Sequence, residues 1–160
     1  MRPDSSLHPV TRVCCAGPVP SELSPRAREM LTQANFGHLA TLMPGGEPKV
    51  DPVWVGLDGT RILVATDAKS LKARNVDADA RVALSVTAFD DPYEQLLVRG
   101  VVAEVRPDDD LAVLDEMSLR YLGTPFPRRR WSSRVVLVVD PVVVRHYSSP
   151  LRDPRLADGG

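Results

Sequence analysis

The chain has 160 residues and a mass of 17.5 kDa, and its 20 basic and 21 acidic side chains give a formal net charge of -1. This length predicts one domain with a core of its own, which excludes a small scaffold held together by disulfides or a structural metal. The near-neutral charge excludes a general nucleic-acid-binding role, which normally shows as a basic domain or stripe. Any site for an anion must therefore be local.

Cysteine content and hydropathy favour a reducing compartment and no membrane span. Cys14 and Cys15 are adjacent, and neighbouring cysteines rarely close a disulfide without strain. The N-terminal residues contain no apolar stretch typical of a secretory signal, and no segment approaches the roughly 18 consecutive apolar residues of a transmembrane helix. We therefore expect a cytoplasmic protein that contacts neither membrane nor nucleic acid.

The chain divides into one domain over residues 21–148 and two tails over residues 1–20 and 149–160. Four prolines and little periodic apolar content predict a flexible N-terminal tail, and the polar C-terminal residues predict a second one. No internal repeat or second domain is visible.

Within the domain, helical and strand periodicity alternate. A helix should begin near Ser21 or Ser24, with Pro25 in its first turn, and end before Gly37. Strands are expected over residues 36–42, 50–57, 61–66, 81–88, 94–105, 134–139 and 142–147. A second helix is expected over residues 70–78, between the third and fourth of these strands. A third helix should lie between Pro107 and Gly123, with one stripe formed by Leu111, Leu114, Ser118, Tyr121 and Leu122.

These elements predict a mainly β fold of six to seven strands. The first three strands should form an antiparallel meander, and the strands together a closed or nearly closed barrel with helices at its ends. Pro52 lacks an N–H donor, so its strand should lie at an edge of the sheet or carry a bulge. Gly100 predicts a break or bulge in the long strand.

Several common catalytic patterns are absent from the sequence. The three histidines stand far apart without cysteine or carboxylate at metal-ligand spacing, so no metal site is expected. No Walker loop, no GxGxxG after a strand and no GxSxG elbow occurs. Classical hydrolases and Rossmann enzymes are therefore disfavoured.

The segment over residues 65–75 has the groups that a phosphate needs. It joins the end of a strand to the start of a helix and combines hydroxyls, free helix N–H groups and the cations Lys69, Lys72 and Arg74. The alternative is that these cations are solvated and balance nearby aspartates. Composition alone leaves both interpretations open.

Five stretches together resemble a known family: FGHLATLMPGGEPKVDPVWVGLDGTRILVAT, SLKARNVDADARVALSV, LLVRGVVAEV, RYLGTPFP and RVVLVVDPVVV. From about Pro25 to Tyr147 the chain resembles the pyridoxamine 5'-phosphate oxidase-like split barrels, and within them the flavin/deazaflavin oxidoreductases. The S-x-K-x-R-N box before the D-x-R-V strand is the sharpest part. The resemblance implies a split β-barrel of the FMN-binding type and a homodimer whose cofactor lies in a groove between the two barrels.

The resemblance also implies a set of cofactor-binding residues. Thr66, Ser70 and Lys72 match positions that hold the ribityl phosphate, with Arg74 and Asn75 beside them in the same box. The strand whose backbone lines the isoalloxazine-type ring matches Pro52, Val53, Trp54 and Val55. Trp54 is suited to stacking near the ring, although an aromatic residue inside a strand more often belongs to the core.

The YLGTPFP segment resembles the subgroup that uses the deazaflavin F420. Its acidic tail would suit Arg128, Arg129, Arg130 and Lys49, for which a solvated basic loop is the alternative. The implied activity is hydride transfer from reduced F420 to a conjugated small molecule. No catalytic side chain is assigned, because the cofactor carries the difficult step. The alternatives are an FMN-binding oxidoreductase of the same family and a non-catalytic member that binds a cofactor without turnover.

Overall fold

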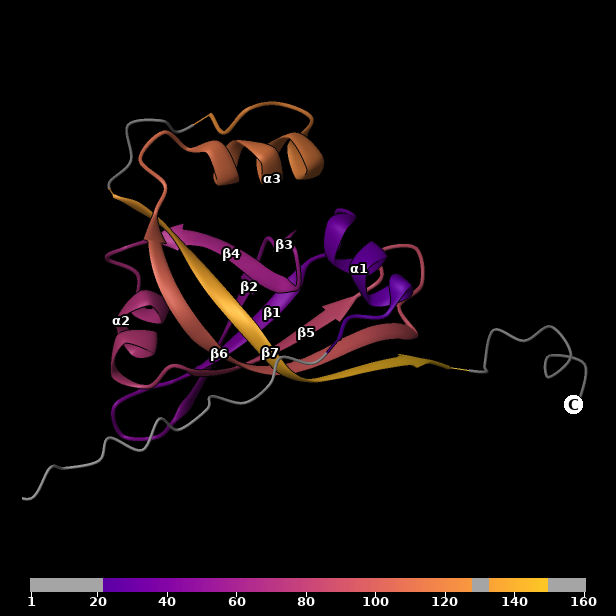
Figure 1. Cartoon of the computed structure of the whole chain (residues 1–160), viewed down its shortest axis with the longest axis horizontal. Coiled ribbons are helices and arrows are strands. Elements are labelled where there is room, and N and C mark those ends of the chain that lie inside the picture. Colours follow the sequence, from indigo (N-terminus) through magenta and orange to yellow (C-terminus); the bar gives the residue numbers. More distant parts are fainter. Residues whose placement is uncertain (1–21, 128–132, 150–160) are drawn as a thin grey trace, which may run out of the picture.

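The fold is mainly β, with one antiparallel sheet and three helices (Figure 1). The structure is a computed structural model and describes residues 22–127 and 133–149. The predicted tails lie outside these residues apart from Ser149. Along the chain the elements are α1 (Pro25–Thr32), β1 (Gly37–Leu42), β2 (Pro48–Val53), β3 (Gly56–Asp58), β4 (Arg61–Asp67), α2 (Leu71–Ala78), β5 (Arg81–Thr87), β6 (Glu94–Pro107), α3 (Ala112–Leu122) and β7 (Arg134–Ser148).

The seven strands of the described residues curl into a barrel in the order β2-β1-β5-β6-β7-β4-β3. The edge strands β2 and β3 are consecutive in the chain, separated by Trp54 and Val55 alone. Two residues cannot span a flat seven-stranded sheet, because strands lie about 4.8 Å apart and six such spacings separate the edges. The sheet must therefore curve until its edges meet, which confirms the predicted barrel.

The predicted three-stranded meander is wrong in one respect. The expected strand over residues 50–57 is two strands, of which β2 pairs with β1 and β3 pairs with β4. Pro52 lies on the edge strand β2, opposite His38, where its missing N–H removes no bond from a central ladder. The edge position that Pro52 predicted is confirmed.

The last two predicted strands are also a single strand, β7, which continues through Pro141. The register of β6 and β7 shifts between Arg99 and Gly100, so that Val143 faces Arg99 and Pro141 faces Gly100, with Val142 left over. A bulge accommodates the proline because the ladder is already interrupted there. The break expected at Gly100 is confirmed, and a Cβ there would lie 2.6 Å from the carbonyl oxygen of Asp140.

Helices α1 and α2 pack against the interior core of the barrel and lie toward its opposite ends (Figure 1). Ser24 caps α1 by accepting a hydrogen bond from the Ala27 N–H at 3.2 Å, and Pro25 is the first helical residue. Met30 and Leu31 on α1 and Val76 on α2 join the same buried cluster as the inward residues of the strands. Among the described residues no helix combines the length and apolar content needed to cross a membrane.

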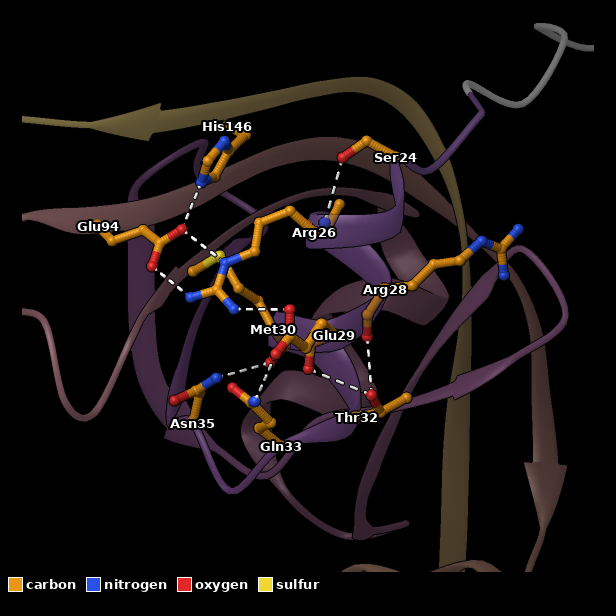
Figure 2. Close-up of polar contacts among 11 residues, drawn as sticks. Ser24, Arg26, Arg28, Glu29, Met30, Thr32, Gln33, Asn35, Glu94 and His146 are labelled. Carbon is orange, nitrogen blue, oxygen red and sulfur yellow. Dashed lines mark hydrogen bonds and ion pairs between the residues drawn. The ribbon is translucent and has the colours of Figure 1, made fainter.

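A buried carboxylate anchors α1 to the ends of β6 and β7 (Figure 2). Glu94 accepts hydrogen bonds from Arg26, including one from Nε at 2.7 Å, and lies 2.7 Å from Nε2 of His146. Arg26 also pairs with Glu29 at 2.7 Å. Mainly because Arg26 donates to it, the pKa of Glu94 falls to about 2, below its usual 4.5. This cluster joins α1 to the start of β6 and to the last residues of β7.

Helix α3 covers the outer side of the barrel instead of an end. Met117 packs with Leu63, Val136 and Val138, whose side chains alternate with those of the interior core. Gly56 leaves room for this contact, since a Cβ there would lie 2.9 Å from the Met117 Cε atom. The predicted helical stripe is wrong at its two ends: Leu111 precedes the helix with a φ of 61°, and Leu122 is exposed, whereas the stop at Gly123 is confirmed.

Candidate functional site

A groove of about 330 Å³ lies on the outer side of the barrel, between the β2 edge and the segment that contains α3. Its volume is within the range of small-molecule and cofactor sites. The lining residues come from five separate segments: Phe36, Pro52, Val53, Trp54, Ala65, Lys72, Leu114, Phe126 and Arg134. The groove therefore joins the two regions that the sequence analysis treated apart, the strand around Trp54 and the helix that begins after Ser70.

One wall of the groove is aromatic. The indole of Trp54 stacks on the ring of Tyr121, with centroids 5.1 Å apart and planes 11° apart. Phe126 meets the same indole edge-on at 6.3 Å, and Phe36 contacts Tyr121 at 5.4 Å. Trp54 is half-buried, so its indole both packs on the α3 side and lines the groove. This wall suits a flat, conjugated ligand.

The last turn of α3 fixes the backbone at the junction of β2 and β3. The Tyr121 hydroxyl donates to the carbonyl of Asn35 and accepts from the Val55 N–H at 3.2 Å. The Arg120 guanidinium donates to the Val55 carbonyl at 2.9 Å. Burial raises the pKa of Tyr121, which favours the protonated form that donates to Asn35. Both polar groups of the Val55 peptide are thus held by side chains of one helix.

Of the four residues predicted to line the ring, Pro52, Val53 and Trp54 line the groove. The Val55 side chain instead lies fully buried in the interior core. Val53 also belongs to the interior core, whereas Trp54, between β2 and β3, packs against the cluster that contains Met117 of α3. For Val55, only the backbone groups remain available to the groove, and the resemblance likewise implied a role for the backbone of this segment.

Lys72 brings the first turn of α2 to one end of the groove. Ser70 is the N-cap: its hydroxyl accepts from the Ala73 N–H at 3.3 Å and lies 3.1 Å from the Thr66 hydroxyl. The first-turn N–H groups of Leu71 and Lys72 have no acceptor within the helix because of their position. Thr66, Ser70 and Lys72 are therefore close together, as predicted, and Lys72 lines the groove.

A carboxylate on β2 lies beside Lys72 and offsets part of the positive charge at this end of the groove. Asp51 lies between two lysines, with Oδ1 accepting from Lys49 and Oδ2 3.9 Å from Lys72. Lys49, expected at an acidic tail, is thus hydrogen-bonded to Asp51. Two lysines and one carboxylate leave one positive charge in excess at this point.

The other predicted cations and the amide lie elsewhere. Arg74 is exposed on α2, and Asn75 is buried, with its side-chain amide donating to the Thr41 hydroxyl at 2.9 Å. That hydrogen bond attaches α2 to β1 instead of facing the groove. The predicted cluster at residues 128–130 lies outside the described residues. No group of three or more potential metal ligands occurs among residues 22–127 and 133–149.

Five further residues complete the lining and were not predicted from the sequence: Phe36, Ala65, Leu114, Phe126 and Arg134. Phe126 lies within the YLGTPFP stretch, which pointed to this region without assigning it a role. Arg134 is the first residue of a strand that continues with apolar residues. In the sequence, a cation at this position indicates only where the strand begins. The groove, with an aromatic wall and a cationic end, has the donor set that a phosphorylated flavin or deazaflavin requires.

The comparisons with known proteins agree with this geometry. Residues 23–148 match the family model described as pyridoxamine 5'-phosphate oxidase. The chain belongs to this family. The predicted family is therefore confirmed, and the family consists largely of oxidoreductases.

Three solved structures are similar to this chain and support the same fold. A protein named F420 reductase is 35% identical, over 74% of this chain and 94% of its own, with a TM-score of 0.66. The protein Rv2991 from Mycobacterium tuberculosis is 22% identical, over 81% of this chain and 86% of its own, with a TM-score of 0.64. A related FMN-binding protein from Nostoc punctiforme is 19% identical, over 78% of this chain and 84% of its own, with a TM-score of 0.56. No curated protein matches the sequence.

Proposed function

We propose that this protein is an F420-dependent oxidoreductase that transfers a hydride from the reduced deazaflavin to a conjugated small molecule. The observation that carries the proposal is the single groove in which Pro52, Val53 and Trp54 lie with Lys72 and Arg134. A flat ring with a phosphorylated side chain needs both kinds of surface within one site. The similarity to the F420 reductase, at 35% identity, favours the deazaflavin over FMN.

The residues of the chain have separable roles in this proposal. The aromatic wall around Trp54 orients a flat ring and keeps water from one of its faces. Ser70, Thr66 and Lys72 bind the phosphoryl group at the start of α2, with Arg74 and Asn75 in the same box. The bound deazaflavin would supply the hydride-transfer chemistry itself. No side chain of the chain is assigned a covalent or proton-transfer step.

We further propose that the protein acts as a homodimer. A second hollow of about 590 Å³ on the β1, β5, β6 and β7 strands is lined mainly by apolar residues, among them Leu42, Ala83, Val101 and Val143. Val50 is 58% exposed on the neighbouring edge strand. An apolar sheet face of this kind is typical of a contact surface. Sedimentation velocity at micromolar concentration should give the mass of two chains, and a single-chain mass would contradict this proposal.

The compartment is proposed from the sequence alone. We assign the activity to the cytoplasm because Cys14 and Cys15 are adjacent and unsuited to a disulfide.

The proposed function is tested by a titration in which the fluorescence emission of Trp54 is measured. The chain has two tryptophans, so the substitution Trp131→Phe leaves Trp54 as the single indole. We expect F420 to quench its emission with micromolar or tighter affinity and FMN to bind much more weakly. The reverse preference would assign the protein to FMN, and binding of neither would refute the proposed function.

Turnover is tested separately from binding. Oxidation of reduced F420 should be followed with quinones, enones and tetrapyrroles, because these conjugated molecules are hydride acceptors of a shape that fits a flat groove. Tight F420 binding without turnover of any acceptor would favour a non-catalytic cofactor-binding protein.

A further inference from the structure

Arg134 has an unusual environment for a guanidinium group. It is the first residue of β7 and lines the groove together with Lys72 and Trp54. Its Nε atom is buried and has no hydrogen-bond partner. Within residues 22–127 and 133–149 no carboxylate forms an ion pair with it. A buried N–H without an acceptor is costly, and such groups usually have a specific explanation.

The position of Arg134 brings it beside the start of α2. The register of β4 and β7 places Arg134 opposite Asp67, so their side chains leave the sheet on the same face. The N–H of Ala68, the residue after β4, donates to the carbonyl of Ser133 at 3.0 Å. Asp67 and Ala68 are followed directly by the turn that ends in the N-cap Ser70. Two segments far apart in sequence thus bring Arg134 and the α2 N-terminus to one end of the groove.

The guanidinium is held in place by an aromatic ring. Its Cζ atom lies 5.0 Å from the centroid of the Phe126 ring, within the distance of a cation–π contact. Asp67, on the opposing strand, directs Oδ1 to the Lys69 N–H at 2.8 Å. The stem of Arg134 is therefore ordered although no carboxylate fixes its charge.

The charges at this end of the groove distinguish Arg134 from the lysines. Lys49 and Lys72 both lie against Asp51, which offsets part of their charge. Arg134 lies opposite Asp67 across the β4–β7 pair but forms no ion pair with a carboxylate of the described residues. Counting only partners within residues 22–127 and 133–149, Arg134 is the cation of the groove lining that has neither an ion pair nor an acceptor for its Nε–H.

We propose that Arg134 is a direct ligand for a phosphoryl group bound in the groove, acting together with Lys72 and the first turn of α2. A guanidinium presents two parallel N–H groups to two oxygens of such a group, which would also give the buried Nε–H its acceptor. This inference rests on the proposed function and deepens it, because it assigns a phosphate ligand from a strand outside the S-x-K-x-R-N box.

The test compares ligands that differ by the phosphoryl group. Arg134→Met keeps the length of the stem and removes the charge, and Arg106→Met makes the same change at a residue outside the groove lining. We expect Arg134→Met to weaken F420 by about 10- to 100-fold, the scale of a charge-assisted hydrogen bond. In Arg134→Met the affinity for FMN, where FMN binds, should fall by a similar factor, and the affinity for riboflavin should not change. Arg106→Met should bind F420 and FMN with the affinities of the parent. The affinity of Arg134→Lys for F420 should lie between those of the parent and Arg134→Met.

A measurement without cofactor separates this inference from the proposed function. Inorganic phosphate should raise the melting temperature of the parent and of Arg106→Met, and this rise should be lost in Arg134→Met. This result would support the inference even if neither F420 nor FMN binds. The inference is overturned if the phosphate effect persists in Arg134→Met. It is also overturned if affinities for riboflavin and FMN fall equally with a large loss of stability, which would indicate a structural role.

Discussion

Replacing Tyr121 by phenylalanine removes one oxygen atom from the point where α3 meets two other segments of the chain. The hydroxyl bonds the carbonyl of Asn35 and the N–H of Val55, so the variant leaves both backbone groups without this partner. The stacking of the ring on Trp54 at 5.1 Å does not depend on the hydroxyl and should persist. The substitution therefore isolates two hydrogen bonds from the packing around them.

The magnitude follows from the burial of these groups. Removing one partner of a buried hydrogen bond costs about 1–3 kcal/mol for each group left unpaired. Asn35 and Val55 are buried, whereas Tyr121 is half-buried, so water can reach part of the site and the lower half of this range applies. At about 1–2 kcal/mol for each of the two groups, we expect Tyr121→Phe to lower the free energy of unfolding by about 2–4 kcal/mol. In a chain of this size the melting temperature should fall by about 5–10 °C.

The assay is urea unfolding followed by circular dichroism, with thermal unfolding as a second measurement. Tyr93→Phe is the matched control, because it removes the same atom from a side chain that is 52% exposed. The control should change the free energy of unfolding by less than about 0.5 kcal/mol. A comparably small effect of Tyr121→Phe would refute the assignment of the two hydrogen bonds.

A double-mutant cycle tests whether α3 holds the Val55 peptide as a unit. Arg120→Met removes the hydrogen bond to the Val55 carbonyl, and Tyr121→Phe removes the one from its N–H. Because both act on backbone groups of the same residue, Val55, their effects should be non-additive by about 0.5 kcal/mol or more. Strict additivity would show that the two side chains act independently.

Three further predictions concern the anion site, the α1 anchor and the strand bulge. Lys72→Ala should weaken binding of F420 by about 1.5–3 kcal/mol in the fluorescence titration, and an unchanged affinity would place the phosphate elsewhere. The pKa of Glu94 is about 2 in the folded chain against its usual 4.5, so its contribution to stability is present above pH 4.5 and is lost as the pH falls through 2. Glu94→Gln should therefore be less stable than the parent at pH 7, with a difference that narrows between pH 5 and 2 in urea unfolding; a constant difference would contradict the linkage. Gly100→Ala should lower the free energy of unfolding by about 1–3 kcal/mol, because its Cβ meets backbone of β7 at 2.6 Å, whereas Gly45→Ala meets only the flexible end of a side chain. Equal stability of these two alanine variants would show that the bulge relaxes freely.

Local signals in the sequence predicted many boundaries correctly. Ser24 and Ser70 cap the helices that follow them, and Gly123 ends α3 with a φ of 75°. Each signal depends on hydrogen bonds or backbone angles within a few residues, so it is readable without the fold. Pro52 and Gly100 likewise predicted an edge and a bulge, because a missing donor and a missing side chain restrict where each can lie.

Errors arose where pairing between distant strands overrides local preference. Asp140 and Pro141 look like a turn, but β7 continues through them because the bulge opposite Gly100 tolerates the missing N–H. The strand around Trp54 and Val55 splits because its two halves pair with different neighbours at opposite edges of the sheet. Neither outcome is encoded within a short window of sequence.

By itself the sequence determined the family, the mainly β fold and the S-x-K-x-R-N box at the start of α2, because motifs and hydrophobic periodicity are properties of contiguous residues. Only the tertiary structure decided that Arg134 lies beside that box, that Trp54 stacks on Tyr121, and that Asn75 is directed to Thr41 instead of the groove. These relations join residues that are far apart in the sequence. Arg134, for example, lies opposite Asp67, 67 positions earlier, and closure of the barrel brings such residues together. The groove exists because the two sheet edges meet beside α3, and no local pattern specifies that meeting.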